Sequence, residues 1–149
     1  MYLVLTALLA LNISKDILDA FVIVNESLAA SSETTAKKLD ALYSDFDLAK
    51  AVDPKKVDNY WARSREARRR ASELNTFIDS VKTTLISKTE KIDRSVADTL
   101  SMELIAKKDD YDTPTNLLIG SKEDGSSGLA NKLKNKIVEY QDAMRELLN

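Results

Sequence analysis

The chain has 149 residues, of which 44% are hydrophobic and 31% charged, enough for one modest domain beside a membrane anchor. Its formal net charge of -2 provides no overall attraction to nucleic acid or to an anionic membrane. The chain contains neither cysteine nor histidine, which excludes disulfides, zinc-thiolate sites and thiol nucleophiles and removes the commonest general base. We therefore expect no enzyme, no metal site and no cofactor.

The chain opens with an apolar stretch, residues 1–24, which we interpret as a single transmembrane anchor helix. Residues 1–11 carry no charge, and the first charges are Lys15, Asp16 and Asp19. A membrane span requires roughly 20 apolar residues, so we expect further residues before Met1. A secretory signal peptide would need a basic lead and an A-x-A-like cleavage site, which are missing here. A buried core helix is the other alternative.

The opening helix also carries features that favour packing against other helices. Thr6, Ala10 and Ser14 recur every four residues and form a strip of small residues, which allows close approach of two membrane helices. Asn12 interrupts the apolar face and would seek a hydrogen bond from a neighbouring helix. A heptad pattern runs through Leu3, Ala7, Ala10, Ser14, Ile17, Phe21, Val24 and Leu28. Apolar helices also contain such strips by chance.

Residues 25–149 show the periodicity of amphipathic helices. One helix is expected to continue from the anchor and to end near Asp53-Pro54, because proline suits only the first turn of the next helix. The second helix buries the following stripe: Val57, Tyr60 or Trp61, Ser64, Ala67, Ala71, Leu74, Ile78, Val81 and Leu85.

Two further helices are predicted towards the end of the chain. Ser87-x-x-Glu90 matches the sequence pattern of a capping box and predicts a third helix that buries Ile92, Val96, Leu100 and Leu104. A long connection over 109–128 contains all three glycines, with a helical turn opened by Thr113-Pro114. The last helix buries Leu129, Leu133, Ile137, Tyr140, Met144 and Leu147. The predicted fold is all-α: a transmembrane helix at 1–24 followed by an up-down four-helix bundle at 25–149.

Two charged segments are candidate sites. Five arginines lie between Arg63 and Arg70 and could bind phosphate, but we favour a solvated face whose guanidinium groups pair with acidic residues of a neighbouring helix. The aspartates between Asp109 and Asp124 fail the calcium-loop pattern, because Thr115 stands where glycine is required, and we interpret them as a surface loop.

Residues 1–21 read MYLVLTALLALNISKDILDAF, and a loop further on reads DDYDTP at 109–114 and leads to Ile119-Gly120. The first stretch closely resembles the membrane-anchor signature of the GldM/PorM family, the gliding-motility and type IX secretion proteins of Bacteroidetes. The Trp61 helix, this loop, and the last helix with Leu133-Lys134 are similar to that family's first periplasmic domain. The family's short basic lead and its further periplasmic domains are not matched by any residue of this chain.

The resemblance implies a homodimeric, single-pass protein of the bacterial inner membrane, with its C-terminal domain in the periplasm. It implies that the membrane helix lies inside a pentameric ring of a GldL/PorL-like membrane protein, and that the pair is a motor driven by proton motive force. The motion would reach further periplasmic and outer-membrane secretion components, with membrane lipid around the anchor and no nucleic acid involved. Carried over by position, Tyr2 is expected to contact the partner ring, together with Thr6, Asn12 and Lys15.

Two other classes of function remain open from the residues alone. A periplasmic four-helix sensor domain of a membrane receptor would require a second membrane helix after the bundle. A helical scaffold without an anchor would require the opening apolar run to be buried inside the fold.

Overall fold

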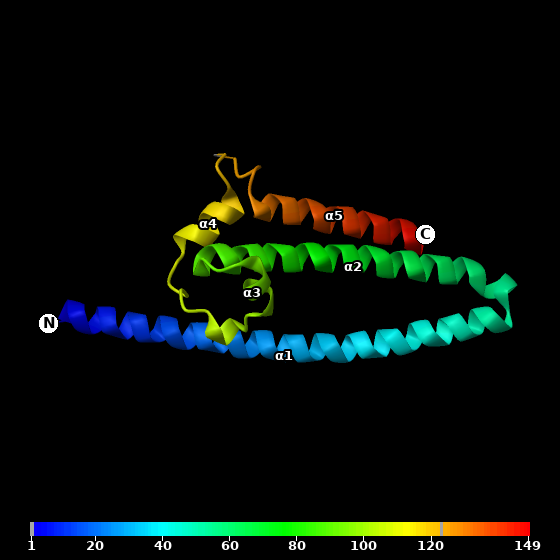
Figure 1. Cartoon of the computed structure of the whole chain (residues 1–149), viewed down its shortest axis with the longest axis horizontal. Helices are drawn as coiled ribbons and strands as arrows, with labels where there is room; N and C mark the ends of the chain where they lie inside the picture. The colour runs from blue at the N-terminus through cyan, green and yellow to red at the C-terminus, as the bar shows by residue number, and fades with distance from the viewer. Residues whose placement is uncertain (1, 123) are drawn as a thin grey trace. The chain divides into compact units, whose positions relative to one another are not determined.

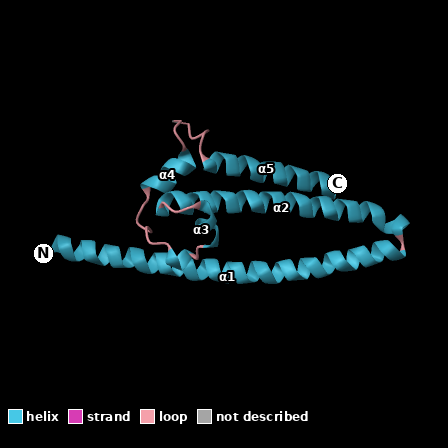
Figure 2. Cartoon of the chain, viewed as in Figure 1, coloured by secondary structure: helices cyan, strands magenta, loops and turns pink. Residues whose placement is uncertain are grey.

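The computed structural model describes the backbone of residues 2–122 and 124–149 and the side chains of residues 20–122 and 124–149. All regular structure in these residues is helical, which confirms the all-α prediction (Figures 1 and 2). The chain divides into two compact units, residues 1–54 and 55–149, which are described separately below.

The first unit is a single helix, α1 (Tyr2–Val52), 51 residues long. It runs without interruption from the apolar stretch into the polar half, as expected. Hydroxyl groups within it donate to carbonyl oxygens one turn earlier, for example Thr34 to Ala30 at 3.0 Å, so their hydrogen bonds are satisfied within the helix. The helix ends at Val52, because the ring of Pro54 disfavours the helical conformation in the residue before it, Asp53.

The predicted membrane anchor, residues 1–24, falls mostly outside the described side chains, which begin at residue 20. Among the residues whose side chains the structure describes, no helix holds a stretch of sufficient length and apolarity to cross a bilayer.

The second unit is built along α2 (Pro54–Glu90), whose first helical residue is proline, as predicted. Most of the predicted stripe is buried or half-buried, but Ile78 is 40% exposed and Phe77 takes its place on the covered face. The most deeply buried side chains lie near the carboxyl end of the helix: Val81, Thr83, Ile86 and Thr89. The core of this unit therefore sits at one end of α2.

The capping box predicted at Ser87 and Glu90 is wrong, because both residues belong to the last turn of α2. Lys91 adopts a left-handed conformation with φ of 60°, and the Ile92 N–H donates to the Ser87 carbonyl at 3.1 Å. This six-residue bond closes a Schellman-type helix end. Glu90 faces a later loop, where its carboxylate accepts from the Lys107 N–H at 2.8 Å.

The third long helix predicted over 92–104 is also wrong. The segment forms the short helix α3 (Arg94–Thr99) and the single 3-10 turn η1 (Met102–Leu104). Each has its own cap, since Asp93 accepts from the Ser95 N–H and Ser101 from the Glu103 N–H. Such side chains compete with continuous helical hydrogen bonding.

The buried residue in this segment is Ala97, whereas Val96 and Leu104, which were expected in the core, are 52% and 69% exposed. With this helix reduced to two short pieces, the predicted packing of four long helices is not confirmed.

The predicted turn at Thr113-Pro114 belongs to α4 (Asp112–Ile119), and the last helix is α5 (Leu129–Leu148), both close to expectation. These two helices pack against each other. The turn between them is tight: a Cβ at Gly128 would lie 1.9 Å from the Leu118 carbonyl oxygen, and Gly120 has φ of 83°. Both positions require glycine for this geometry.

Candidate functional site

The residues predicted to contact a partner helix, Tyr2, Thr6, Asn12 and Lys15, belong to the helical backbone of α1. Their side chains lie outside the described residues, as do those of the small-residue strip Thr6, Ala10 and Ser14. The structure therefore places these positions on one uninterrupted helix and leaves their roles as predictions.

The arginine segment of α2 is engaged in ion pairs along its own helix. Glu66 accepts from Arg69 at 2.8 Å and 2.5 Å and from Arg70 at 2.8 Å, and Arg69 also pairs with Glu73. The hydrogen bonds from Arg69 and then Arg70 lower the pKa of Glu66 to about 2, from its ordinary value of 4.5. The predicted solvated face is supported, but these acidic partners lie one turn away on α2 instead of on a neighbouring helix.

Two arginines of the segment make other contacts. Arg65 lies 5.1 Å from the centre of the Trp61 ring, a cation–π arrangement. The Arg63 guanidinium donates to the Leu147 carbonyl at 3.2 Å. A cation at the carboxyl end of α5 satisfies an otherwise unpaired carbonyl and favours the helix dipole. Arg63 therefore ties the end of α5 to the first half of α2.

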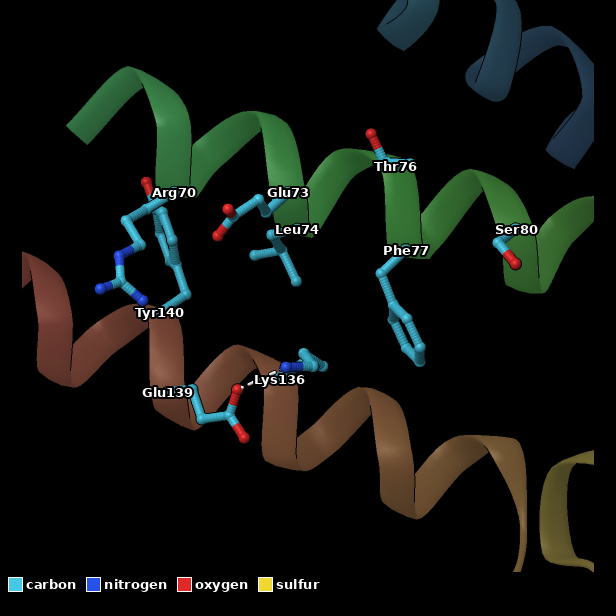
Figure 3. Close-up of a pocket in the computed structure, with 9 residues that line it drawn as sticks. All are labelled: Arg70, Glu73, Leu74, Thr76, Phe77, Ser80, Lys136, Glu139 and Tyr140. Carbon is cyan, nitrogen blue, oxygen red and sulfur yellow. Dashed lines mark hydrogen bonds and ion pairs between the residues drawn. The ribbon is translucent and has the colours of Figure 1, made fainter. Parts of the chain in front are cut away.

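A groove of about 480 Å³ runs between α2 and α5 (Figure 3). Leu74 and Phe77 point from α2 towards α5, and Tyr140 points back from α5. Charged side chains form the edge, among them Lys136, which donates to Glu139 at 2.7 Å. The helical periodicity predicted Leu74 and Tyr140 on the facing stripes but missed Phe77, since Ile78 fitted the same step.

The groove has an apolar floor and paired charges at its edge. Such a surface suits contact with another helix. The aromatic ring of Tyr140 and the side chain of Leu74 supply the apolar area, and the Lys136–Glu139 pair defines one border.

A smaller polar hollow of about 400 Å³ lies over the carboxyl half of α2 and over α3. The buried Thr83 hydroxyl donates to the Asp98 carboxylate at 2.9 Å, and the Arg94 guanidinium donates to Thr84 at 3.0 Å. These bonds hold the short helix α3 against α2 near the core. Their role is structural, because each polar group is used inside the fold.

The aspartates of the 109–124 segment act as local caps. Asp110 accepts from the Thr113 N–H at 2.9 Å at the start of α4, and Asp124 accepts from the Ser126 N–H at 2.9 Å. The backbone hydrogen bond, reinforced by the side chain of the same residue, lowers the pKa of each carboxyl group. In the part of the chain that the structure describes, no group of three acidic residues is arranged to hold a metal ion.

A family model described as the GldM N-terminal domain matches residues 16–149. The match begins within α1 and includes every helix of the second unit. No curated protein and no solved structure matches the chain significantly. Because the matched region covers far more than half of the chain, the protein belongs to the GldM family of gliding-motility and type IX secretion proteins.

Proposed function

We propose that this chain is a membrane-anchored subunit of a motor that uses proton motive force to power type IX protein secretion and gliding. The observation that carries the proposal is the family match over residues 16–149. In this proposal residues 1–24 span the inner membrane once and the second unit lies in the periplasm. The chain performs no catalysis of its own and transmits motion that is generated in the membrane. The family match supports this reading over a sensor domain.

The form of α1 supports a transmitting role. Its 51 residues extend about 76 Å at 1.5 Å per residue, with no proline before Pro54 to kink them. A displacement or rotation applied to the apolar end therefore reaches Val52 through continuous hydrogen-bonded backbone. A chain broken into short helices would lose the motion at each flexible joint.

The proposed partners follow from the family. Two copies of the helix lie inside a pentameric ring of a GldL/PorL-like membrane protein, and the second unit contacts further periplasmic and outer-membrane secretion components. Two helices cannot satisfy five surrounding subunits equally, so protonation of one ring subunit would shift the preferred arrangement. The anchor has few ionisable groups, and we place the titrating carboxylate on the partner.

Substitution of the predicted contact residues tests this proposal in cells. We expect Tyr2→Ala and Asn12→Leu to impair both gliding and secretion while the protein level stays normal, because each change removes a polar contact to the ring. Tyr2→Phe is the matched control, because it keeps the size and shape of the aromatic side chain and removes only its hydroxyl group. Normal gliding and secretion in both variants would contradict the assigned contact surface.

Copurification addresses the assembly directly. The intact protein, extracted in mild detergent, should copurify with a small membrane protein, in a ratio of five copies of that partner to two copies of this chain. In cells, an ionophore that collapses the proton gradient should stop gliding while the ATP level stays unchanged. Motion that persists without the gradient would refute the motor.

A further inference from the structure

The second unit consists of two parts that are fastened in different ways. In the first part, α3 is fixed to the carboxyl half of α2, because the buried Thr83 hydroxyl donates to the Asp98 carboxylate at 2.9 Å and Ala97 is only 1% exposed. The second part is the hairpin of α4 and α5, whose longer helix α5 lies alongside α2 (Figure 1). Within Asp112–Ile119 and Leu129–Leu148 no residue is buried. These two helices therefore contribute only half-covered or exposed side chains to the unit.

The hairpin is closed by contacts of its own. Gly128 approaches α4 so closely that a Cβ there would lie 1.9 Å from the Leu118 carbonyl oxygen. On one side of the turn the Gly120 N–H donates to the Asn116 carbonyl at 2.8 Å, and on the other the Lys132 N–H donates to the Gly128 carbonyl at 3.3 Å. Helical hydrogen bonding thus continues up to the turn from both sides. The two helices can move together without giving up these bonds.

Hydrogen bonds at two separate places attach the hairpin to α2. At its far end, the Arg63 guanidinium donates to the Leu147 carbonyl at 3.2 Å. Before α4, the Lys107 N–H donates to the Glu90 carboxylate at 2.8 Å, which fixes the connecting segment to the last turn of α2. Between these places lies the groove of about 480 Å³, so the packing of α5 on α2 is incomplete there (Figure 3).

We propose that the α4–α5 hairpin opens from α2 as one piece, while α2 and α3 stay together, and that Arg63 is the latch at its far end. The pivot lies in residues 108–111, between the anchored Lys107 and the start of α4. Elements that bury little apolar surface open at a lower free energy than the core does. Opening uncovers Leu74 and Phe77 on α2. This conformational change goes beyond the proposed motor function and does not depend on it.

The position of Arg63 suits it to hold the hairpin closed. Leu147 lies one residue before the end of α5, whose 20 residues extend about 30 Å. A bond at the end furthest from the pivot resists rotation of the hairpin with the longest lever arm. The bond is charge-assisted, and a cation beside the last carbonyls of a helix also favours its dipole.

Hydrogen exchange of the intact purified protein, followed by mass spectrometry, tests the inference. In the unsubstituted protein we expect the slowest amides of residues 112–119 and 129–148 to share one protection factor, which is lower than that of residues 83–99. Arg63→Ala should lower the shared factor about tenfold, as the loss of one charge-assisted hydrogen bond predicts, and leave residues 83–99 unchanged.

Arg69→Ala is the matched control for that substitution. Its guanidinium group pairs with Glu66 and Glu73 along α2 itself, so its removal should leave the exchange of α4 and α5 unchanged. Circular dichroism of each variant verifies that the helices are retained. The exchange of the unsubstituted protein tests the opening without any substitution.

Several results would contradict the inference. One common protection factor for α5 and residues 83–99 in the unsubstituted protein would show that the second unit opens as a whole. Faster exchange in Arg63→Ala that is limited to the last turn of α5 would mean fraying of one helix end, and unchanged exchange would mean that Arg63 holds nothing closed. Equal acceleration by Arg69→Ala would indicate a general loss of stability of α2 in place of a latch.

Discussion

The two units of this chain obtain their order in different ways. The first unit is a single helix, and every apolar side chain described on it is exposed or only half-covered. The second unit buries a small core where α3 meets the carboxyl end of α2, and it fastens its other elements with caps, a tight glycine turn and the bond from Arg63 to α5. A helix without internal tertiary contacts must gain its stability from outside, whereas a unit with a core can fold alone.

The comparison predicts that a substitution that destabilises the second unit leaves the first unit unaffected. Among such substitutions, Gly128→Ala should cause the largest loss of stability. The added methyl group would meet the carbonyl oxygens of Leu118 at 1.9 Å and Ile119 at 2.3 Å, so the α4–α5 turn must open. We expect a loss of more than about 3 kcal/mol in the free energy of unfolding. Denaturant titration followed by the fluorescence of Trp61, the single tryptophan, measures it.

Gly125→Ala is the control for that substitution. A Cβ there meets nothing closer than 3.8 Å, but the φ of 69° still disfavours alanine, so a cost of about 1–2 kcal/mol is expected. Equal effects of the two variants would mean that the contact at Gly128 does not determine the turn.

The second test compares the loss of stability when a buried and an exposed aliphatic residue are each replaced by alanine. Ile86 in the core is 6% exposed and Leu48 on α1 is 64% exposed. We expect Ile86→Ala to lower the free energy of unfolding by about 2–4 kcal/mol, because it leaves a cavity. Leu48→Ala should change it by less than about 0.5 kcal/mol. A comparable loss from Leu48→Ala in calorimetry would show that the first unit has a core after all.

The smallest expected effect on stability comes from removing an ion pair. The folded pKa of Glu66, about 2, lies below its ordinary value of 4.5, so its ion pairs stabilise the fold above pH 4.5 and lose that contribution as the pH falls towards 2. We expect Glu66→Gln to lower Tm slightly at neutral pH, with the difference vanishing near pH 2. Glu33→Gln, which removes a single exposed pair with Lys37 in the first unit, should show a smaller difference in Tm at neutral pH.

Long periodic segments of this chain were predictable, and short capped ones were not. The end of α1, the start of α2 and the position of α5 followed from Pro54 and from the apolar step along each helix. The end of α2 was missed because its left-handed residue is Lys91, where glycine is the usual signal. The pattern Ser-x-x-Glu can occur in the last turn of one helix as well as in the first turn of the next. Only the tertiary contact of Glu90 with Lys107 distinguishes these two positions.

The candidate surfaces, too, were predictable from the sequence only in part. The stripes of α2 and α5 predicted which helix faces form the groove, but the choice of Phe77 over Ile78 depends on how α5 lies against α2. The local pairing of Arg69 and Arg70 with Glu66 was readable from spacings of three and four residues, although the prediction placed the acidic partners on another helix. Contacts at greater separation, such as Arg63 with Leu147, have no signal in the local sequence.

One residue separates the two longest helices. The Asp53 N–H still donates to the Ala49 carbonyl at 3.0 Å, so helical hydrogen bonding persists up to the break, and only the proline ring that follows prevents its continuation. A single imino acid thus decides whether the polypeptide continues beyond Val52 as one long helix or begins a second helix at Pro54.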